Sequence, residues 1–262
     1  MRQYTTGSIV SNRLIATGIY DMTLTFDKDL SDARAGQFAQ IFVPRGELLL
    51  PRPISLCGID REKGTLRVVY QVVGKGTDYF SKLQIGDPLR ILAPLGNGFA
   101  IFPKKKRVAI AGGGVGVPPM LELAKELKTK APDVEISVFL GFRSEPFLIQ
   151  DFAALGVKLH VATDDGSVGF KGNVIALMES LGYSADVVYG CGPKIMLKSL
   201  NQWADANGAM CFVSMEERMA CGLGACAGCA IPVKDRKGDD WHYKKVCKEG
   251  PVFKGSEVIW DA

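Results

Sequence analysis

The sequence predicts a multi-domain chain made of an antiparallel β-barrel, an α/β domain with a parallel sheet, and a small cysteine-rich domain. Three observations lead to this prediction. Short β-type runs fill residues 1–102, strand-like and helix-like segments alternate through residues 103–210, and a characteristically spaced set of four cysteines lies within residues 211–262. A length of 262 residues is enough for two domains of ordinary size and a smaller third one.

The first 102 residues are predicted to form the barrel, because their runs of Val, Ile, Thr and Phe are short and are separated by Gly, Pro and Asp turns. No long helical pattern interrupts these runs, and closely spaced short strands are typical of small antiparallel barrels. The runs are SIVSNRLIATG, MTLTF, QFAQIFV, TLRVVYQVV and PLRILAP.

A candidate anion-binding motif stands at the edge of this barrel, in the segment LLLPRPISLCG. Its central residues are Arg52, Pro53, Ile54 and Ser55. A guanidinium group can donate two parallel hydrogen bonds to phosphate oxygens, a serine hydroxyl can add another, and proline holds the segment extended. A surface arginine in a strand explains the tetrapeptide equally well at this point.

Residues 103–210 change character, because β-type runs now alternate with helical spacing. After the run RVAIAGG, apolar residues at Met120, Ala124, Leu127 and Ala131 follow the spacing of one helix face. The strands EISVFLGF, KLHVAT and DVVYGCG then alternate with helices near PFLIQDFAAL, GNVIALMESL and PKIMLKSLNQWADAN. Such alternation indicates βαβ units and a parallel sheet.

A glycine loop follows the first of these strands and precedes its helix. It contains Gly112, Gly113, Gly114 and Gly116. Free N–H groups at a helix start and the helix dipole together favour a bound phosphate. The loop is not the GxGxxG fingerprint with a following acidic residue, and a tight turn without a ligand is the alternative.

A second turn, Gly190-Cys191-Gly192-Pro193, ends the last predicted strand of the α/β domain. Ligands of open α/β sheets bind at the carboxyl ends of the strands. Glycines on both sides would let a planar ring approach Cys191. A strand-end turn with a buried thiol is the alternative.

Four cysteines in the tail have the spacing C-x4-C-x2-C followed by a distant fourth. They are Cys221, Cys226, Cys229 and Cys247. This is the plant-type spacing for a 2Fe–2S cluster, and the glycines between them allow the chain to wrap closely around it. A zinc site or unrelated core thiols are the alternatives, but zinc usually takes two close pairs.

The remaining features exclude several classes of protein. Seven cysteines are an odd number, and the N-terminal MRQYTTGSIV lacks the apolar segment of a signal peptide, so we expect reduced thiols and a cytoplasmic location. Cys57 and Cys211 are then interpreted as small buried residues. The basic run at residues 104–107 is short, and no apolar run is long enough to cross a membrane, so nucleic acid and membrane are not expected partners.

The motifs, in this order, resemble the ferredoxin–NADP reductase superfamily. The tail ERMACGLGACAGC together with GGGVGVPPM is similar to the electron-transfer subunits of class 1B, NAD-dependent dihydroorotate dehydrogenases. This resemblance implies a ferredoxin reductase-like FAD domain (1–102), an NAD-binding α/β domain (103–210) and a 2Fe–2S domain (211–262). It implies that FAD is bound by Arg52, Pro53, Ile54, Ser55, Val69, Tyr70, Gln71, Gly76 and Thr77. It implies that NAD is bound by Gly112, Gly113, Gly114, Gly116 and Gly192, with Cys191 as a catalytic residue near the nicotinamide.

The same resemblance implies a function. Electrons would pass from an FMN-containing catalytic subunit through the 2Fe–2S cluster and FAD to NAD⁺, in UMP biosynthesis, within a heterotetramer of two plus two subunits. FAD belongs between the other two carriers because it exchanges either one or two electrons. Neither His160 nor His242 lies in a recognisable motif, so no base for dihydroorotate oxidation is found here and the chain alone should not catalyse it.

Two other interpretations stay open at this point. One is a different reductase built from the same modules, and the other is a redox sensor. The choice between NAD and NADP also stays open, because Arg143 and Ser144 could contact the 2′-phosphate of NADP. Val115 stands where many reductases of the superfamily have threonine, which leaves the placement of the nicotinamide open.

Overall fold

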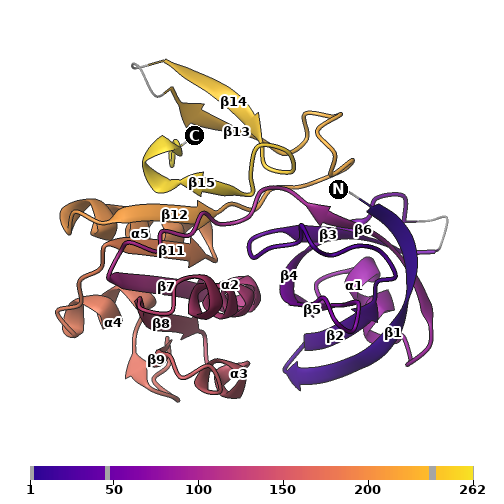
Figure 1. Cartoon of the computed structure of the whole chain (residues 1–262), viewed down its shortest axis with the longest axis horizontal. Helices are drawn as coiled ribbons and strands as arrows, with labels where there is room; N and C mark the ends of the chain where they lie inside the picture. Colours follow the sequence, from indigo (N-terminus) through magenta and orange to yellow (C-terminus); the bar gives the residue numbers. More distant parts are fainter. Residues whose placement is uncertain (1–2, 45–47, 236–239, 262) are drawn as a thin grey trace.

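The computed structural model describes residues 3–44, 48–235 and 240–261. These residues form a closed six-stranded barrel, a seven-stranded sheet with helices on both faces, and a two-stranded hairpin. Figure 1 shows the barrel and the sheet side by side, with the C-terminal segment lying over β12 and close to the barrel. The predicted fold class is confirmed.

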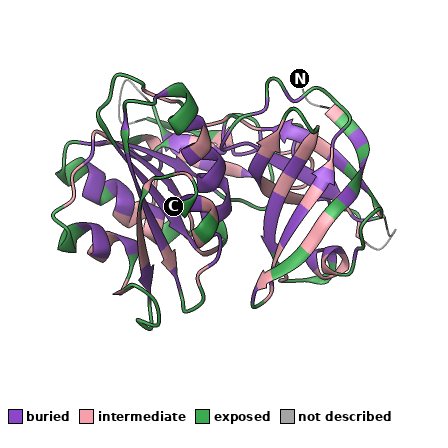
Figure 2. Cartoon of the chain, turned by 60° about the horizontal axis from the view of Figure 1, so that its bottom comes forward, coloured by how far each residue is buried: buried purple, intermediate pink, exposed green. Residues whose placement is uncertain are grey.

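The barrel forms because its strands alternate inward and outward residues. In β1, Thr5, Gly7 and Ile9 are buried, whereas Tyr4 and Val10 are exposed. Figure 2 shows this alternation along the strand. The strand order is β1-β2-β5-β4-β3-β6, and every neighbouring pair is antiparallel. The strands are β1 (Gln3–Ala16), β2 (Ile19–Thr25), β3 (Phe38–Phe42), β4 (Arg52–Asp60), β5 (Thr65–Gln71) and β6 (Pro88–Leu95), and the barrel segment also holds the helix α1 (Lys75–Ser81).

The larger sheet has the order β10-β9-β8-β7-β11-β12-β15. Its strands are nearly continuous apolar runs because helices cover both faces. All pairs are parallel except that of β12 with β15. The strands are β7 (Arg107–Gly113), β8 (Glu135–Phe142), β9 (Lys158–Thr163), β10 (Phe170–Lys171), β11 (Val187–Cys191), β12 (Met210–Ser214) and β15 (Val252–Lys254). The helical segments are η1 (Gly114–Gly116), α2 (Val117–Lys130), α3 (Ile149–Ala153), α4 (Val174–Ser180), α5 (Lys194–Ala206) and η2 (Gly255–Glu257).

Helix α2 lies between the sheet and the barrel. Its apolar face belongs to a core that includes Ile19 and Val69 of the barrel. The carboxylate of Glu126 accepts a hydrogen bond from the N–H of Ala35 at 2.7 Å, and that of Glu122 accepts one from Ile59 at 3.3 Å. The two domains are therefore joined by a shared core and by hydrogen bonds to two buried carboxylates.

The C-terminal segment is tied into the larger sheet. Its hairpin consists of β13 (Ala230–Lys234) and β14 (Trp241–Lys245), and β15 then pairs with β12. The expected domain division at 210/211 falls within β12, directly after its first residue Met210, and β12 is a strand of the parallel sheet. The division into three domains stays a prediction. In the described part of the chain, no helix has both the length and the apolar character that crossing a bilayer requires.

Candidate functional site

The first two cysteines of the tail form a close pair. The Sγ atoms of Cys221 and Cys226 lie 3.3 Å apart, and Cys221 Sγ accepts N–H groups of Leu223 and Cys226, each at 3.4 Å. Gly222 and Gly224 have φ values of +65° and +85°, which glycine adopts without steric cost, so the loop can curl around Cys221. Burial acts to raise the pKa of Cys221, but the N–H donors outweigh it and lower the pKa to about 6.

The other two cysteines form a second, buried pair. The N–H of Cys247 donates to Cys229 Sγ at 3.5 Å, and the N–H of Val246 donates to the carbonyl of Cys229 at 2.9 Å. Burial, together with the adjacent Cys229 thiol, raises the pKa of Cys247 to about 12. Both cysteines share a hydrophobic core with Phe38 and Leu95 of the barrel. The cysteine loop (residues 221–229) therefore belongs to a segment that packs on the barrel.

This arrangement distinguishes between the metal groups that four thiols could hold. Within the described ranges, no three His, Cys, Asp or Glu side chains gather around one ion position. A tetrahedral zinc site needs all its ligands at one point, whereas a two-iron cluster takes two thiolates on each iron. Two neighbouring pairs of thiols fit the two irons of such a cluster.

The predicted flavin residues 52–55 form the start of β4, in register with β3. Pro53 is opposite Gln40, and Ser55 is opposite Phe38. Because side chains of directly opposed residues point to the same face of a sheet, Pro53 and Ser55 lie on the same face as Gln40 and Phe38. This is the outer face of the barrel, since the neighbouring Ala39 and Ile41 belong to the barrel core. The outer face is on the side of the cysteine segment, since Phe38 and Cys229 belong to the same hydrophobic core.

Arg52 lies across the start of α1. A methyl group on Gly76 would overlap Arg52 Nε and lie 2.7 Å from its Cζ, and Arg52 Nη1 donates to the Leu50 carbonyl at 2.5 Å. The hydroxyl of Thr77 accepts the N–H of Val73 at 3.0 Å and donates to the Gly74 carbonyl at 3.1 Å. The Thr77 hydroxyl is therefore already engaged in closing the turn before α1.

The three predicted flavin residues on β5 differ in exposure. Val69 is buried and Gln71 is exposed. Tyr70 is buried, stacks on Tyr20 with ring centroids 5.8 Å apart, and donates its hydroxyl to Asn12 at 3.1 Å. Burial raises the pKa of the Tyr70 hydroxyl, so this group stays neutral at physiological pH.

The glycine loop (residues 112–116) and the turn at 190–193 meet in space. A methyl group on Gly116 would overlap the carbonyl oxygen of Cys191, and one on Gly192 would lie 3.1 Å from the N of Gly113. A methyl group on Gly114 would meet nothing within 4 Å, so this position faces open space. The structure therefore brings the two predicted nucleotide segments together and leaves Gly114 accessible.

Cys191 lies at the carboxyl end of β11, between Gly112 of β7 and Ser214 of β12. Burial raises the pKa of its thiol to about 12, while a hydrogen bond with Ser214 acts in the opposite direction. The thiol is therefore neutral near pH 7 and offers shape and polarisability rather than negative charge.

Two residues near this site were not anticipated from the sequence. Lys245 Nζ donates to the Gly224 carbonyl of the cysteine loop at 2.7 Å. Gln40 lies in the middle of the buried strand β3 with its amide against Gly222. A polar residue inside the apolar run QFAQIFV was the available signal for Gln40. Lys245 gave no such signal, because lysines are common in that segment.

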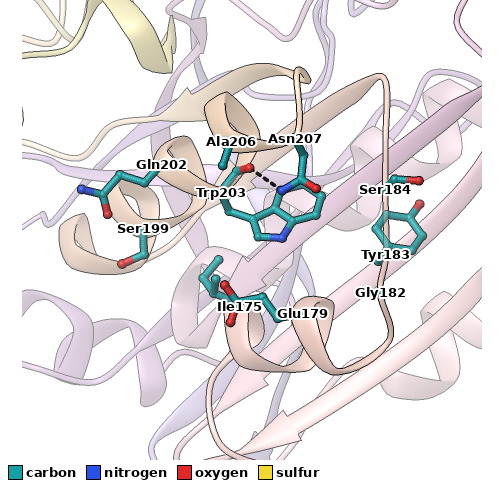
Figure 3. Close-up of a pocket in the computed structure, with 10 residues that line it drawn as sticks. All are labelled: Ile175, Glu179, Gly182, Tyr183, Ser184, Ser199, Gln202, Trp203, Ala206 and Asn207. Carbon is teal, nitrogen blue, oxygen red and sulfur yellow. Dashed lines mark hydrogen bonds between the residues drawn. The ribbon is translucent and has the colours of Figure 1, made fainter.

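A cavity of about 660 Å³ lies elsewhere, between α4 and α5, and Figure 3 shows its lining. Asn207 Nδ2 donates to the Trp203 carbonyl at 2.8 Å in its wall. None of the predicted site residues lines it. The lining residues are Ile175, Glu179, Gly182, Tyr183, Ser184, Ser199, Gln202, Trp203, Ala206 and Asn207.

Known proteins resemble this chain along its whole length. The dihydroorotate dehydrogenase B (NAD(+)) electron transfer subunit of Caldanaerobacter subterraneus subsp. tengcongensis is 43% identical over 260 residues, covering 99% of this chain and 100% of that protein. The protein of the same name from Enterococcus faecalis (strain ATCC 47077 / OG1RF) is 44% identical over 261 residues, covering 96% and 97%. A family model for the iron-sulfur cluster binding domain of dihydroorotate dehydrogenase B matches residues 216–259.

Solved structures agree with the fold. A chain from the NADH-dependent reduced ferredoxin-NADP oxidoreductase structure superposes with a TM-score of 0.87 at 32% identity, covering 97% of this chain and 90% of that one. The cytochrome b5 reductase domain of Ulva prolifera nitrate reductase superposes with a TM-score of 0.65 at 19% identity, covering 79% and 94%. The second likeness shows the fold alone. From the full-length relatives and the iron–sulfur domain, the chain belongs to the family of dihydroorotate dehydrogenase B (NAD(+)) electron transfer subunits.

Proposed function

We propose that this chain passes electrons from an FMN-containing catalytic subunit through a 2Fe–2S cluster and FAD to NAD⁺. The observation that carries the proposal is the packing of the cysteine segment on the barrel strands of the flavin motif. Phe38 stands opposite Ser55 and shares a core with Cys229 and Cys247. Short separations between carriers are what a chain of single-electron steps requires.

The four thiols are proposed to hold the cluster as two pairs. Cys221 and Cys226 would bind one iron, and Cys229 and Cys247 the other, because each pair is already assembled by the fold. The N–H groups of Leu223 and Cys226 that point at Cys221 Sγ would stabilise negative charge on that side. The buried pair would be shielded from solvent by the barrel.

The reductase fold and the iron–sulfur domain support FAD as the second carrier. When bound, FAD supplies exchange of electron pairs with a nicotinamide and of single electrons with a cluster. Arg52 and Ser55 would hold its phosphates, and Gly76 leaves room for the Arg52 guanidinium. The other proposed FAD contacts are Pro53, Ile54, Val69, Tyr70, Gln71 and Thr77.

The nicotinamide nucleotide is proposed to bind where the glycine loop meets the 190–193 turn. Gly114 faces open space there, and Gly112, Gly113, Gly116 and Gly192 keep the backbone bare on both sides. Cys191, neutral at this strand end, would contact the nicotinamide without repelling its transferred hydride. NAD rather than NADP is proposed because the full-length relatives are named for NAD(+).

A catalytic partner subunit follows from the chain's place as an electron transfer subunit. Both histidines are engaged in other contacts: His160 stacks on Phe139 at 4.8 Å, and His242 pairs with Asp235 at 2.8 Å. Removing a proton from dihydroorotate would then be the partner's task. We propose a complex of two plus two subunits in the cytoplasm, with the cysteine loop and its exposed Leu223 in the interface.

The proposal is tested by separating the two half-reactions. The purified chain should bleach at visible wavelengths when NADH is added, but it should oxidise dihydroorotate only after the FMN-containing subunit is supplied. Substantial dihydroorotate oxidation by the chain alone would contradict this division of labour. A partner that co-purifies with further metal clusters would instead favour a different reductase.

A further inference from the structure

Gln40 is a buried polar residue of the barrel strand β3. It stands in the middle of β3, is 0% exposed, and neither its Oε1 nor its Nε2 has a hydrogen-bond partner in the described part of the chain. Leaving a buried amide unpaired costs on the order of 1–3 kcal/mol. An amide in this state indicates a partner that the protein chain itself does not supply.

The side chain is directed at the cysteine loop. A methyl group on Gly222 would overlap Gln40 Nε2 and lie 2.8 Å from its Cγ, so no side chain separates the amide from the residue next to Cys221. Gly222 has a φ of +65°, a backbone conformation that favours glycine. The absence of a side chain at this position lets the Gln40 amide approach the loop backbone closely.

The same residue is linked to the flavin motif through the backbone. Gln40 is opposite Pro53 across the β3–β4 pair, and it shares the outer face of β3 with Phe38 and Ser55. The residues Ala39 and Ile41 on either side point instead into the barrel core. Gln40 thus lies between the strand proposed to hold FAD and the loop proposed to hold the cluster.

The groups around Gln40 indicate which kind of hydrogen-bond acceptor could pair with its amide N–H. Gly222 offers no side chain, and Cys221 Sγ already accepts two N–H groups at 3.4 Å. A bound cluster would add several sulfur acceptors beside the Gln40 amide. Amide N–H groups donate to such sulfurs, and the bonds strengthen as the cluster gains negative charge, which raises its potential.

We propose that Gln40 is a positioning residue for the iron–sulfur cluster. Its amide N–H donates a hydrogen bond to a sulfur on the Cys221 side, which holds the cysteine loop against β3 and raises the midpoint potential. This inference rests on the proposed function, because it requires the cluster to be present.

The test compares the midpoint potential of the cluster in the wild-type chain and in Gln40→Met, measured by EPR-monitored redox titration. Methionine has a similar volume but no N–H donor. A lower potential with an undiminished cluster signal supports the proposal, and an unchanged potential overturns it. Asn201→Leu is the matched control and should leave the potential unchanged. Asn201 is also a buried amide with an unpaired Oδ1 close to a glycine, but that glycine is Gly255, outside the cysteine loop.

A second measurement uses only the wild-type chain, so it does not depend on whether Gln40→Met folds. Pulsed EPR of the reduced cluster should detect a coupled ¹⁵N nucleus when the glutamine side chains are labelled with ¹⁵N. Absence of this coupling overturns the proposal. A wild-type chain without any 2Fe–2S signal would instead refute the proposed function, so the two failures can be distinguished.

Discussion

Position 76 has no side chain, and this leaves the space that the Arg52 guanidinium occupies. An added methyl group would overlap Arg52 Nε and lie 2.8 Å from Nη2. Any side chain at this position would therefore displace the group proposed to bind the FAD phosphates. The contact is local, but its two residues come from β4 and α1.

Gly76→Ala should weaken FAD binding about tenfold or more, equivalent to at least ~1.4 kcal/mol. The reason is that Arg52 must move away from its hydrogen-bonding position. Flavin fluorescence on titration of the apoprotein measures the change. Gly74→Ala is the control, because Gly74 has extended backbone and open space around it, and it should retain the wild-type affinity. Equal affinities of the two variants would contradict the assignment of Arg52.

Cys226→Ser should abolish the cluster while leaving hydride transfer from NADH to FAD, because the proposed cluster loses one of its four thiolate ligands but the barrel and the glycine loop are unchanged. Iron content and EPR report the first effect, and stopped-flow flavin reduction reports the second. Cys211→Ser removes a buried thiol outside the cysteine set and should keep the cluster. Full iron content in Cys226→Ser would refute its role as a ligand.

At the scale of elements, α2 carries two buried carboxylates toward the barrel. Glu122 is 3% exposed and Glu126 is 8% exposed. Burial raises the pKa of Glu122 to about 7, with Glu126 acting in the same direction and Lys125 against it. The contact of α2 with the barrel therefore depends on the protonation state of Glu122.

The free energy of unfolding should fall as the pH rises from 4.5 to about 7, by at most about 2–3 kcal/mol from this residue. The folded state holds the Glu122 proton more tightly than the unfolded chain, so the stabilisation is complete below pH 4.5 and is lost as pH rises through the folded pKa. Chemical denaturation across this range measures it. In Glu122→Gln the fall should be smaller by this amount. An identical pH profile in wild type and variant would contradict the shifted pKa.

At the scale of the whole molecule, one arginine links the barrel to the α/β domain. Arg67 of β5 binds Asp21 through Nε and Nη2, each at 2.9 Å, and Asp151 of α3 through Nη1 at 2.5 Å. Asp21 is buried, so its negative charge depends on Arg67 for most of its stabilisation. The pair thus couples the stability of the barrel to domain docking.

Arg67→Met should destabilise the chain by about 3 kcal/mol, because it leaves the buried Asp21 carboxylate without its main partner. Equilibrium unfolding in urea measures the loss. Adding Asp21→Asn in the same chain should recover part of it. Lys82→Met breaks the exposed pair with Asp78 and should change the stability by less than about 1 kcal/mol. A similar small effect for both lysine and arginine variants would show that the buried pair is not a significant contact.

Most strands and helices of the barrel and of the α/β domain were predictable because each segment carries its own period. The strand β4 is not among the predicted runs, since Pro51 and Pro53 flank its first residue. The run at 107–113 and the helical spacing from Met120 to Ala131 are local patterns, and the structure forms β7 and α2 there. The place of β12 and β15 in the sheet was not predictable, because these strands are short and their pairing joins residues about 40 positions apart.

The sequence by itself determined the fold class, the family and the four candidate ligands, since these depend on spacing and composition along the chain. Only the tertiary structure decided that the thiols form two pairs, that the glycine loop meets Cys191, and that Gln40 lies against Gly222. The physical reason is distance along the chain. Contacts between β3 and the cysteine loop join residues about 180 positions apart, and they arise from domain packing rather than from any local period.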